Sequence, residues 1–555
     1  MDGKQIRQAV RVAVGNAAIM GRAVVKTGLA RDISARGALL YARQRLAGSV
    51  GPATLHRIHA ANHPDKLALI FGRDRWTYRE LDDRIDRLAA GLRDKHGIKP
   101  GDAAILVMHN RPEFLEIQSA MARLGGAAVT VSWRSTPAEL TYLVEHSGAR
   151  AIFAEVEVSD GVASARPELT SVPEGNVFAI AGSRAGFLPY EAIAGTTGLT
   201  GPDNTEGSVV IYTSGTTGKP KGAVRKFPKE AAAAVMAFMI ETPIATDDRH
   251  LAVCPMYHST AFGFIAMTFV VGGTVVIDRG FEPERFLATV ARERITTTAV
   301  VPTMLHRLLE LPRETIRRYD TSSLRAVFSG GAPLSGALAR RFIDTFGPVL
   351  FNFYGATETG LNTIATSDEL VLAPGTIGHM VPGNEIRLLD DAGHDVPAGK
   401  TGELWVRNQM LVAGYHRDAD ATEQAMRDGF FSVGDLGHVD RHGLYHLDGR
   451  KRDMIITGGV NVYPAEVEET LHQHPAIGEA AVIGVPDAEW GERVCACVVP
   501  RSGWALTPEE VTAFCKSRLS GPKVPREVVL YSELPKNPTG KVLKRELRAQ
   551  RSAAR

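Results

Sequence analysis

The feature that most constrains the fold is a recurring alternation of short apolar runs with amphipathic segments. Leu67–Phe71 has the length and character of a buried strand. Thr77 and Glu80 then form a capping box, which predicts the start of a helix. Strands separated by helices favour a parallel, doubly wound sheet, because parallel neighbours need crossover connections. Further strands are predicted at Ala103–Met108, Ala127–Ser132 and Ala151–Ala154, a helix start at Asn110 and Pro112, and a second capping box at Thr136 and Glu139.

The remaining chain divides into regions that differ in their pattern of predicted strands and helices. The same α/β rhythm returns from Leu251 to Val301 and from Leu324 to Tyr354. Short strands with Gly and Pro between residues 375 and 439 indicate a small β-rich subdomain. At 555 residues the chain exceeds the roughly 250–300 residues of one compact domain. We therefore expect a large N-terminal α/β domain at 49–449, whose doubly wound sheets carry the β-rich subdomain, and a small, mobile α+β C-terminal domain at 454–555, with a helix at Pro464–His472 and strands at Glu479–Val485 and Val494–Val499.

Charge and cysteine content exclude two classes of function. Lys and Arg number 64 against 62 Asp and Glu, and this net charge of +2 gives no electrostatic case for nucleic acid as a partner. The four cysteines, Cys254, Cys495, Cys497 and Cys515, lack metal-ligand spacing. We expect reduced thiols in the core of a cytoplasmic protein.

Residues 1–48 differ from the rest because they are basic and nearly free of acidic residues. Arg7, Arg11, Arg22 and Lys26 would fall on one side of a helix. No apolar run reaches the ~18 residues needed to span a bilayer. Three alternatives stay open for this extension: a helix lying on an anionic membrane surface as a peripheral contact, a helix packed on the protein, and a frayed tail.

The strongest chemical signal is the segment from Tyr212 to Gly222. Its glycines permit backbone angles that other residues avoid, and its hydroxyls and backbone N–H groups can turn toward an anion. The composition indicates a polyphosphate cradle, although the spacing is not that of a Walker loop. The residues that form the core of this cradle are Thr213, Ser214, Gly215, Thr216, Thr217, Gly218 and Lys219.

This segment resembles the phosphate motif of the adenylate-forming superfamily, which includes acyl-CoA synthetases, adenylation domains and luciferases. The resemblance runs from about residue 50 to 545 and is supported by several further motifs in the family's order. It implies that ATP, Mg²⁺ and coenzyme A are used to activate a carboxylate. The acid is first joined to AMP with release of pyrophosphate and is then passed to the CoA thiol.

The segment Tyr354–Glu358 resembles the family's adenine and metal motif. The likeness implies that Tyr354 stacks on adenine, that Thr357 contacts the α-phosphate, and that Glu358 holds Mg²⁺ together with Thr216. Both Thr357 and Glu358 are expected to take part in catalysis. Other nucleotide-binding residues implied by the family's motifs are Gly330, Gly331, Ala332, Asn352 and Gly355.

Two later motifs extend the resemblance toward the C-terminus. Asp435 and Arg450 match the ribose-side residues, and Lys541, in a Pro-rich frame ending in Gly-Lys, matches the catalytic lysine of adenylation. Residues 450–453 resemble the hinge about which the C-terminal domain turns. The family usually has Asp or Lys where this chain has Arg452, which is not a neutral exchange for Lys.

The acid and thiol sides are also implied by resemblance. His258 lies in a segment similar to the acyl-pocket motif, and Gly458 and Gly459 lie in one similar to the hairpin beside the pantetheine tunnel. Apolar stretches after His258 favour a medium- or long-chain fatty acid as substrate, although a buried core would contain the same residues. Two rival functions stay open: a fatty acyl-AMP ligase that loads a carrier-protein thiol, and a non-catalytic acyl-binding relative.

Overall fold

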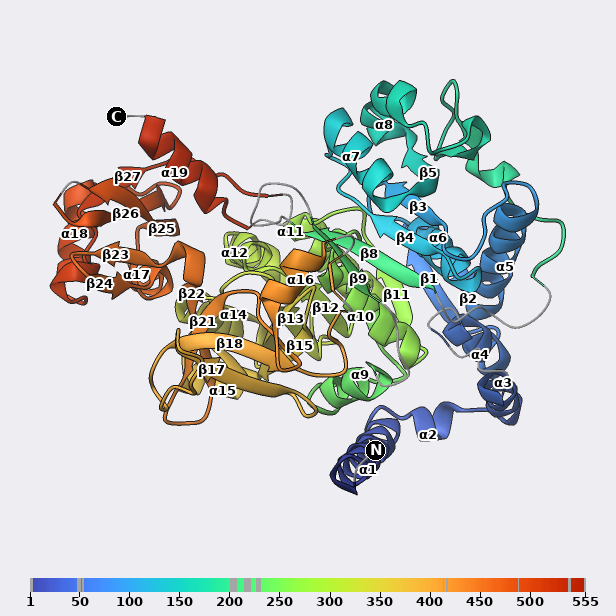
Figure 1. The fold of residues 1–555 in the computed structure, drawn as a ribbon, viewed down its shortest axis with the longest axis horizontal. Coiled ribbons are helices and arrows are strands. Elements are labelled where there is room, and N and C mark those ends of the chain that lie inside the picture. The colour runs from blue at the N-terminus through green and yellow to red at the C-terminus, as the bar shows by residue number, and fades with distance from the viewer. Residues whose placement is uncertain are drawn as a thin grey trace. The chain divides into compact units, whose positions relative to one another are not determined.

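The computed structural model describes residues 3–46, 51, 54–199, 207–213, 221–225, 231–412, 414–415, 418–487, 489–537 and 541–553 (Figure 1). The chain forms two compact units. The first contains residues 1–300, 311–327 and 408–424, and the second contains residues 301–310, 328–407 and 425–555.

One sheet of the first unit has seven strands in the order β7-β6-β5-β3-β4-β8-β9. All neighbours from β7 to β8 run parallel, and only β8 and β9 are antiparallel. The strands are β3 (Ala103–Val107), β4 (Ala127–Thr130), β5 (Ala149–Glu155), β6 (Val177–Ile180), β7 (Leu188–Pro189), β8 (Ser208–Thr213) and β9 (Lys221–Arg225).

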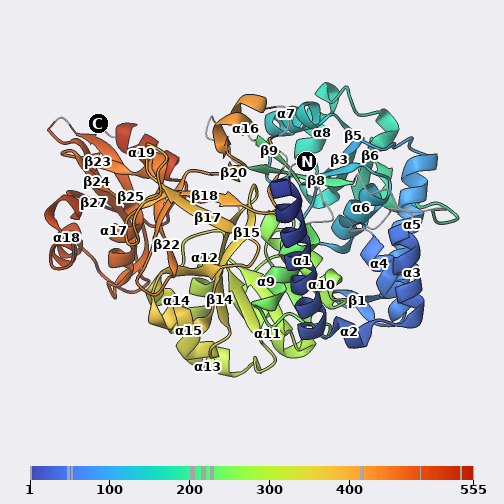
Figure 2. The same cartoon turned by 60° about the horizontal axis from the view of Figure 1, so that its bottom comes forward.

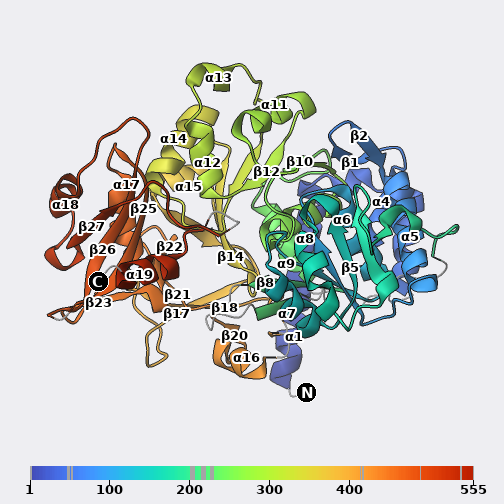
Figure 3. The same ribbon diagram turned by 90° about the horizontal axis from the view of Figure 1, so that it is seen from above.

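Helices cover both faces of this sheet, as Figure 3 shows around β5. On one face Ile105 and Val107 pack with Leu140 of α7 and Val162 of α8. On the other face α6 contacts β3 and β4, and α5 packs against α6. The predicted doubly wound arrangement is thereby confirmed. The helices are α5 (Tyr78–Asp94), α6 (Pro112–Arg123), α7 (Pro137–Ser147) and α8 (Asp160–Ala165).

The other sheet of the first unit contains β1 (Leu67–Phe71), which matches its predicted bounds. Strand β1 pairs parallel with β11, β11 with β10, and β10 with β12, while β2 closes the edge antiparallel. These strands are β2 (Asp74–Thr77), β10 (Arg249–Ala252), β11 (Thr274–Ile277) and β12 (Thr297–Val300), with helices α10 (Ser259–Val270), α11 (Pro283–Glu293), α13 (Arg313–Arg317) and α16 (Ala419–Ala425).

The N-terminal segment is helical: α1 (Gly3–Lys26), α2 (Leu29–Asp32), α3 (Ala35–Leu46) and α4 (Thr54–Asn62). Helix α1 lies beside α9 (Ala231–Ile240), and Figure 2 shows the two side by side. The side chain of Ala23 in α1 is buried, whereas Val25 is 74% exposed. Among the described residues, none of the helices is both long enough and apolar enough to cross a bilayer.

The second unit contains the β-rich region expected between residues 375 and 439. Its strands follow the order β19-β20-β18-β21-β22-β16-β15-β14-β13, with β17 paired to β18. They are β13 (Ala326–Ser329), β14 (Leu350–Ala356), β15 (Gly360–Ala365), β16 (Thr376–Met380), β17 (Glu385–Leu389), β18 (Gly402–Arg407), β19 (Met426–Arg427), β20 (Phe430–Phe431), β21 (Asp435–Val439) and β22 (Tyr445–Arg450), with helices α12 (Pro302–Leu309), α14 (Gly336–Phe346) and α15 (Ser367–Leu372).

The C-terminal part of the second unit is a small α+β assembly. The long hairpin of β25 (Ile477–Asp487) and β26 (Gly491–Pro500) has an apolar cluster on each face. Cys495 and Cys497 are buried in one cluster and Cys515 in the other, and all four cysteines are free and buried as expected. The other elements are β23 (Ile455–Thr457), β24 (Val460–Val462), β27 (Glu527–Leu530), α17 (Pro464–His472), α18 (Pro508–Lys516) and α19 (Lys544–Ala553).

Candidate active site

The β21–β22 hairpin places Asp435 directly opposite Arg450 in the antiparallel register. The Arg450 Nε donates a hydrogen bond of 3.0 Å to Asp435 Oδ1. Burial acts to lower the pKa of Arg450, but Asp435, Tyr354 and Asp453 together outweigh it and raise that pKa. The two ribose-side residues predicted 15 positions apart are therefore a charge-assisted pair.

Tyr354 joins this pair from β14. Its hydroxyl donates to Asp435 Oδ2 over 2.9 Å, and the ring is buried beside Ile377 and Leu404. Burial raises the pKa of Tyr354 well above its ordinary value, and the Asp435 charge adds to this effect. Both oxygens of Asp435 are thus held in position, and each retains a lone pair that can accept from a ligand hydroxyl.

Lys541 belongs to the same electrostatic environment. Its backbone N–H donates to Asn537 Oδ1 over 2.8 Å. Burial lowers the pKa of Lys541 to about 8, with a further decrease from Arg450 and an opposing increase from Asp435. Residues 435, 450 and 541, far apart in the sequence, are therefore near one another within the second unit.

The turn between β14 and β15 carries Thr357 and Glu358. A side chain at Gly355 would bring its Cβ within 2.0 Å of the Gly360 carbonyl oxygen, so this hairpin requires glycine there. Glu358 is only 7% exposed. The amide of Asn352, in the same strand as Tyr354, donates to the Thr376 carbonyl over 2.9 Å, so this bond braces β14 against β16.

The segment after β13 contains Gly330, Gly331 and Ala332. A Cβ at Gly330 would lie 2.4 Å from the ring of Phe353, so only glycine allows this loop to lie against β14. Gly331 adopts a φ of 76°, which favours glycine. The buried Ser329 Oγ beside them has no hydrogen-bond partner among the described residues, so it is available to bond a ligand.

The segment predicted as a phosphate cradle begins at Thr213, in the first unit. Thr213 ends β8 and pairs with Lys221 at the start of the antiparallel strand β9, so the cradle connects two neighbouring strands. Ser214, Gly215, Thr216, Thr217, Gly218 and Lys219 lie outside the described residues.

His258 lies at the N-terminus of α10, also in the first unit. Its side chain does not cap that helix. Its buried Nε2 lacks a partner within the described parts of the chain, and burial lowers the pKa of the imidazole to about 4. At neutral pH His258 therefore presents an uncharged imidazole, next to the Tyr257 ring at 4.5 Å between centroids.

Gly458 and Gly459 form the turn between β23 and β24, with φ values of 56° and 78°. Two consecutive positive φ values are typical of a tight hairpin turn. The Gly458 N–H donates to the Trp490 carbonyl, and a Cβ at Gly458 would lie 2.6 Å from the Trp490 ring. Arg452 lies in the short helical turn Lys451–Asp453 before this hairpin, and burial followed by the Arg450 charge lowers its pKa.

A divalent cation fits the site only with ligands from a bound polyphosphate. Within the described ranges, no group of three or more His, Cys, Asp or Glu residues could hold a metal ion. Glu358 supplies one buried carboxylate. Mg²⁺ commonly takes one or two protein carboxylates and completes its shell with phosphate oxygens and water, so Glu358 and Thr216 match that donor set.

The sequence analysis missed one group of residues at the carboxyl ends of β3 and β5. His109 and Arg111 were not singled out, and Asn110 was read with Pro112 as a helix start, which was wrong for Asn110. Helix α6 begins at Pro112 with Arg111 as its N-cap residue and no side-chain cap bond. The available signal was that polar residues follow directly after a buried strand of a parallel sheet, where ligand sites tend to form.

Two family models match the chain. The model for AMP-binding enzymes covers residues 57–416, and that for the AMP-binding enzyme C-terminal domain covers residues 466–541. The chain belongs to the AMP-binding enzyme family.

Known relatives extend over most of the chain. A feruloyl-CoA synthase of Amycolatopsis is 36% identical over 488 residues, which is 87% of this chain and 96% of that protein. A long-chain-fatty-acid–CoA ligase of Yersinia pestis is 33% identical over 521 residues, or 88% and 92% of the two chains. The crystal structure of the anthranilate CoA ligase AuaEII with anthranoyl-AMP superimposes with a TM-score of 0.84 at 25% identity, covering 91% of this chain and 98% of that one.

Proposed function

We propose that this protein is an AMP-forming acid–CoA ligase, which uses ATP and coenzyme A to convert a carboxylic acid into its CoA thioester. The observation that carries the proposal is the convergence of Tyr354, Asp435, Arg450 and Lys541 in one unit. Family membership supports ATP and CoA as the substrates, with Mg²⁺ as the usual partner of ATP.

In the proposed mechanism Asp435 accepts hydrogen bonds from the ribose hydroxyls. Tyr354 and Arg450 hold its two carboxylate oxygens, so the acceptor does not have to reorganise when ATP binds. The buried Tyr354 ring supplies a face for adenine, and the glycine loop at Gly330–Ala332 brings backbone close to the base. Asn352 acts indirectly, by bracing the strand that carries Tyr354.

Lys541 supplies positive charge to the first half-reaction. Its lowered pKa shows a buried amine whose surroundings disfavour the cation before substrates arrive. The α-phosphate and the substrate carboxylate are both anionic, so their binding would favour the ammonium form. The cation then stabilises the negative charge that gathers between the attacking carboxylate and the α-phosphorus, and Thr357 contacts the same phosphate.

The β- and γ-phosphates are assigned to the cradle from Thr213 to Lys219. Glu358 and Thr216 are the residues that would hold Mg²⁺. When bound, the ion neutralises charge on the departing pyrophosphate.

An aromatic carboxylic acid is the substrate class that we propose. His258 has a neutral, buried imidazole whose Nε2 is unpaired among the described residues and can bond a polar ring substituent or the carboxylate, while Tyr257 supplies an aromatic neighbour. The relatives that act on ferulate and anthranilate by name support an aryl acid.

A fatty acid, which the sequence analysis favoured, is the second candidate. The Yersinia pestis relative is by name a long-chain-fatty-acid–CoA ligase. The buried face of α10 is also apolar, with Phe264, Ile265 and Phe269. This face would suit an alkyl chain and equally an aryl ring, so substrate class has to be measured.

For the second half-reaction, residues 454–555 are proposed to turn as one domain against residues 49–449, about the hinge at 450–453. Lys541 and the Gly458–Gly459 hairpin both belong to the moving part. One rotation about Arg452 would therefore withdraw the lysine and present the hairpin to the pantetheine arm. The CoA thiol then attacks the acyl-adenylate and releases AMP.

The experiment is a panel of acids with ATP, Mg²⁺ and CoA, scored by pyrophosphate release and by the mass of acyl-CoA. An aryl acid such as ferulate should give the highest kcat/KM. A higher value with a straight-chain fatty acid would assign the second candidate instead. Acyl-adenylate that accumulates without acyl-CoA would indicate the carrier-protein rival, and the absence of pyrophosphate release with every acid would defeat the ligase assignment.

A peripheral membrane contact is a separate proposal for α1. The helix is basic and free of acidic residues, and Arg22, Val25 and Lys26 line an outward hollow beside Ile240. This combination suits an anionic lipid surface. Co-sedimentation with vesicles of anionic lipid, but not of neutral lipid, should decrease when Arg22 and Lys26 are both changed to Gln; equal sedimentation of the variant would refute it.

A further inference from the structure

Asn110 uses its whole amide to hold backbone groups of a neighbouring segment. The residue follows β3 and is only 3% exposed. Its Nδ2 donates to the carbonyl oxygens of Cys254 over 2.9 Å and Asp278 over 3.1 Å, and its Oδ1 accepts the Met256 N–H over 2.8 Å. Because buried backbone groups outside regular structure need partners, this one side chain satisfies three of them.

The segment held by Asn110 leads directly to His258. Residues 254–257 connect β10 to the N-terminus of α10, where His258 lies. A second clamp comes from β4, where the buried Thr130 Oγ1 donates to the Tyr257 carbonyl over 3.0 Å. The backbone of this loop is therefore set by side chains from the carboxyl ends of two strands in the other sheet of the unit.

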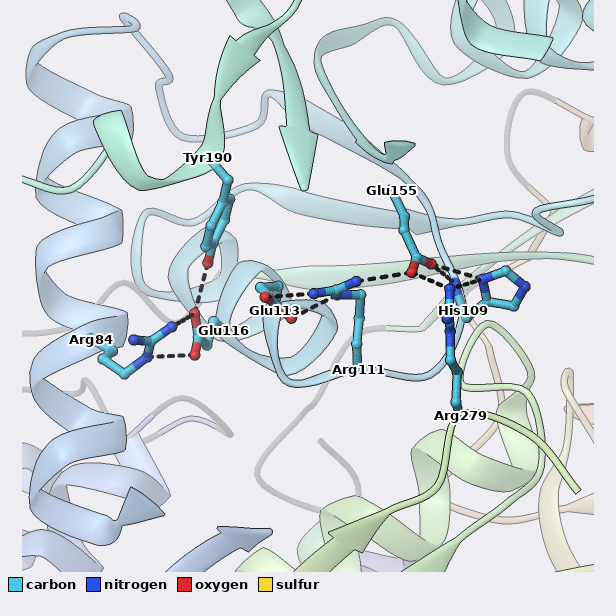
Figure 4. Close-up of polar contacts among 8 residues, drawn as sticks. All are labelled: Arg84, His109, Arg111, Glu113, Glu116, Glu155, Tyr190 and Arg279. Carbon is cyan, nitrogen blue, oxygen red and sulfur yellow. Dashed lines mark hydrogen bonds and ion pairs between the residues drawn. The ribbon is translucent and has the colours of Figure 1, made fainter. Parts of the chain in front are cut away.

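The residues on either side of Asn110 are themselves fixed by one buried carboxylate, as Figure 4 shows. Glu155 Oε2 accepts from the backbone N–H of His109 over 3.0 Å and from its ring Nδ1 over 2.8 Å. Glu155 Oε1 accepts from Arg111 over 2.9 Å and from Arg279 over 2.6 Å. These donors outweigh burial and lower the pKa of Glu155, so the carboxylate stays charged at neutral pH.

The contacts of Glu155 also extend to the end of β11, where the chain supplies one of the carbonyl partners of Asn110. The carbonyl of Asp278 accepts from Asn110, and Arg279 is the next residue in the chain. Glu155 therefore bonds a neighbour of each residue in this contact: Arg111 beside Asn110, and Arg279 beside Asp278. Arg111 is also held by Glu113 on α6, at 2.8 Å. Asn110 thus has little freedom to shift, and neither does the loop that it holds.

We propose that Asn110 is a positioning residue that sets the acid-binding wall through the loop 254–257, and thereby determines which carboxylic acids are accepted. The inference rests on the proposed function, in which His258 faces the acid. Asn110 does not itself touch the acid. A small movement of the loop would displace His258, and displacement of a positioning group is enough to reduce productive binding strongly.

The test compares Asn110→Ala with a matched control, Asn176→Ala. Asn176 is also buried in the first unit and donates to two carbonyls, those of His96 and Arg150, but it does not contact the loop. Thr130→Val is a milder variant, because it removes one hydrogen bond at constant shape. The readouts are KM for the acid and for ATP in pyrophosphate exchange, and the ratio of kcat/KM for an aryl acid to that for a straight-chain acid.

For Asn110→Ala we expect KM for the acid to rise about tenfold or more, with KM for ATP within about twofold and a changed ratio between the two acids. Thr130→Val should shift the same quantities in the same direction by less. Asn176→Ala should lower thermal stability but leave both KM values unchanged. Combining Asn110→Ala with His258→Ala should cost less than the sum of the two single changes, because one acts through the other.

Three results would overturn the inference: equal rises in KM for acid and ATP, the same acid effect in Asn176→Ala, or additive effects with His258→Ala. Should Asn110→Ala not fold, Thr130→Val and its combination with His258→Ala decide the question. A wild-type protein that activates no acid would defeat the proposed function itself, whereas an active wild type with an unchanged acid KM in both loop variants would defeat only the role of Asn110.

Discussion

Lys541 is the residue whose environment says most about the chemistry. Burial and the neighbouring Arg450 lower its pKa to about 8, so its charge state changes close to physiological pH. The motif around Lys541 predicts, by resemblance, that this residue is the adenylation lysine. Its proximity to Asp435 and Arg450 could not be predicted, because the three positions share no local pattern and are brought together by the fold.

The pH dependence of acid activation should report this group. The protonated amine is the form that stabilises charge in the transition state, so kcat/KM for pyrophosphate exchange should fall as pH rises through about 8. Lys541→Arg keeps its charge at high pH and should shift that decline upward by more than one pH unit, with a reduced maximum. Lys536→Ala is the control, because that amine bonds Glu479 instead. A decline at the same pH in Lys541→Arg would contradict the assignment.

At the scale of elements, the sequence correctly predicted features that depend on neighbouring residues alone. The capping boxes at Thr77 with Glu80 and Thr136 with Glu139 are present, and β1 and α17 match their predicted bounds. The prediction was wrong at Asn110, which has the residue type of a helix cap but bonds a distant loop instead. A side chain with two equally favourable uses cannot be assigned from sequence, because the choice depends on what the fold brings near it.

The capping box of α7 gives a quantitative prediction. Thr136→Ala removes the bond that the threonine hydroxyl accepts from the Glu139 N–H, and this should cost about 1 kcal/mol of local stability. Amides in the first turns of α7 should then exchange with solvent roughly fivefold faster in native-state hydrogen exchange. Thr136→Ser retains the hydroxyl and should exchange like the wild type. Equal acceleration in both variants would show that the cap contributes nothing.

For the molecule as a whole, buried neutral histidines set how stability depends on pH. Burial lowers the pKa of His56 and His250 to about 3 and that of His59 and His258 to about 4. An unfolded histidine titrates near 6.5, so below that pH the unfolded chain binds more protons than the folded one. The contribution of these histidines to the free energy of unfolding is therefore fully present above pH 6.5 and is lost as pH falls toward 4.

Thermal unfolding should show this dependence directly. The melting temperature should be nearly constant from pH 7 to 8 and should decrease between pH 6.5 and 5. His250→Gln keeps a polar partner for Thr297 but does not titrate, so its decrease over the same range should be smaller. A melting temperature that stays flat down to pH 5 would show that these side chains are protonated in the folded state.

The overall architecture was predictable because two periodicities recur along most of the chain. Apolar runs of strand length separated by amphipathic helices left few arrangements other than parallel sheets covered on both faces. Long-range polar contacts were beyond prediction. Glu155, for example, is a glutamate at the end of an apolar strand in the sequence, yet it accepts from His109, Arg111 and Arg279 in two other connecting segments.

The central claim, that Lys541 serves acid activation from within the site of Asp435 and Arg450, is tested most directly by separating the two half-reactions in Lys541→Ala. Acyl-adenylate formation from ATP and acid should fall by about 100-fold or more, as for other removed transition-state contacts. Thioester formation from supplied acyl-adenylate and CoA should remain within a few-fold of the wild type. Equal losses in both half-reactions would contradict the account.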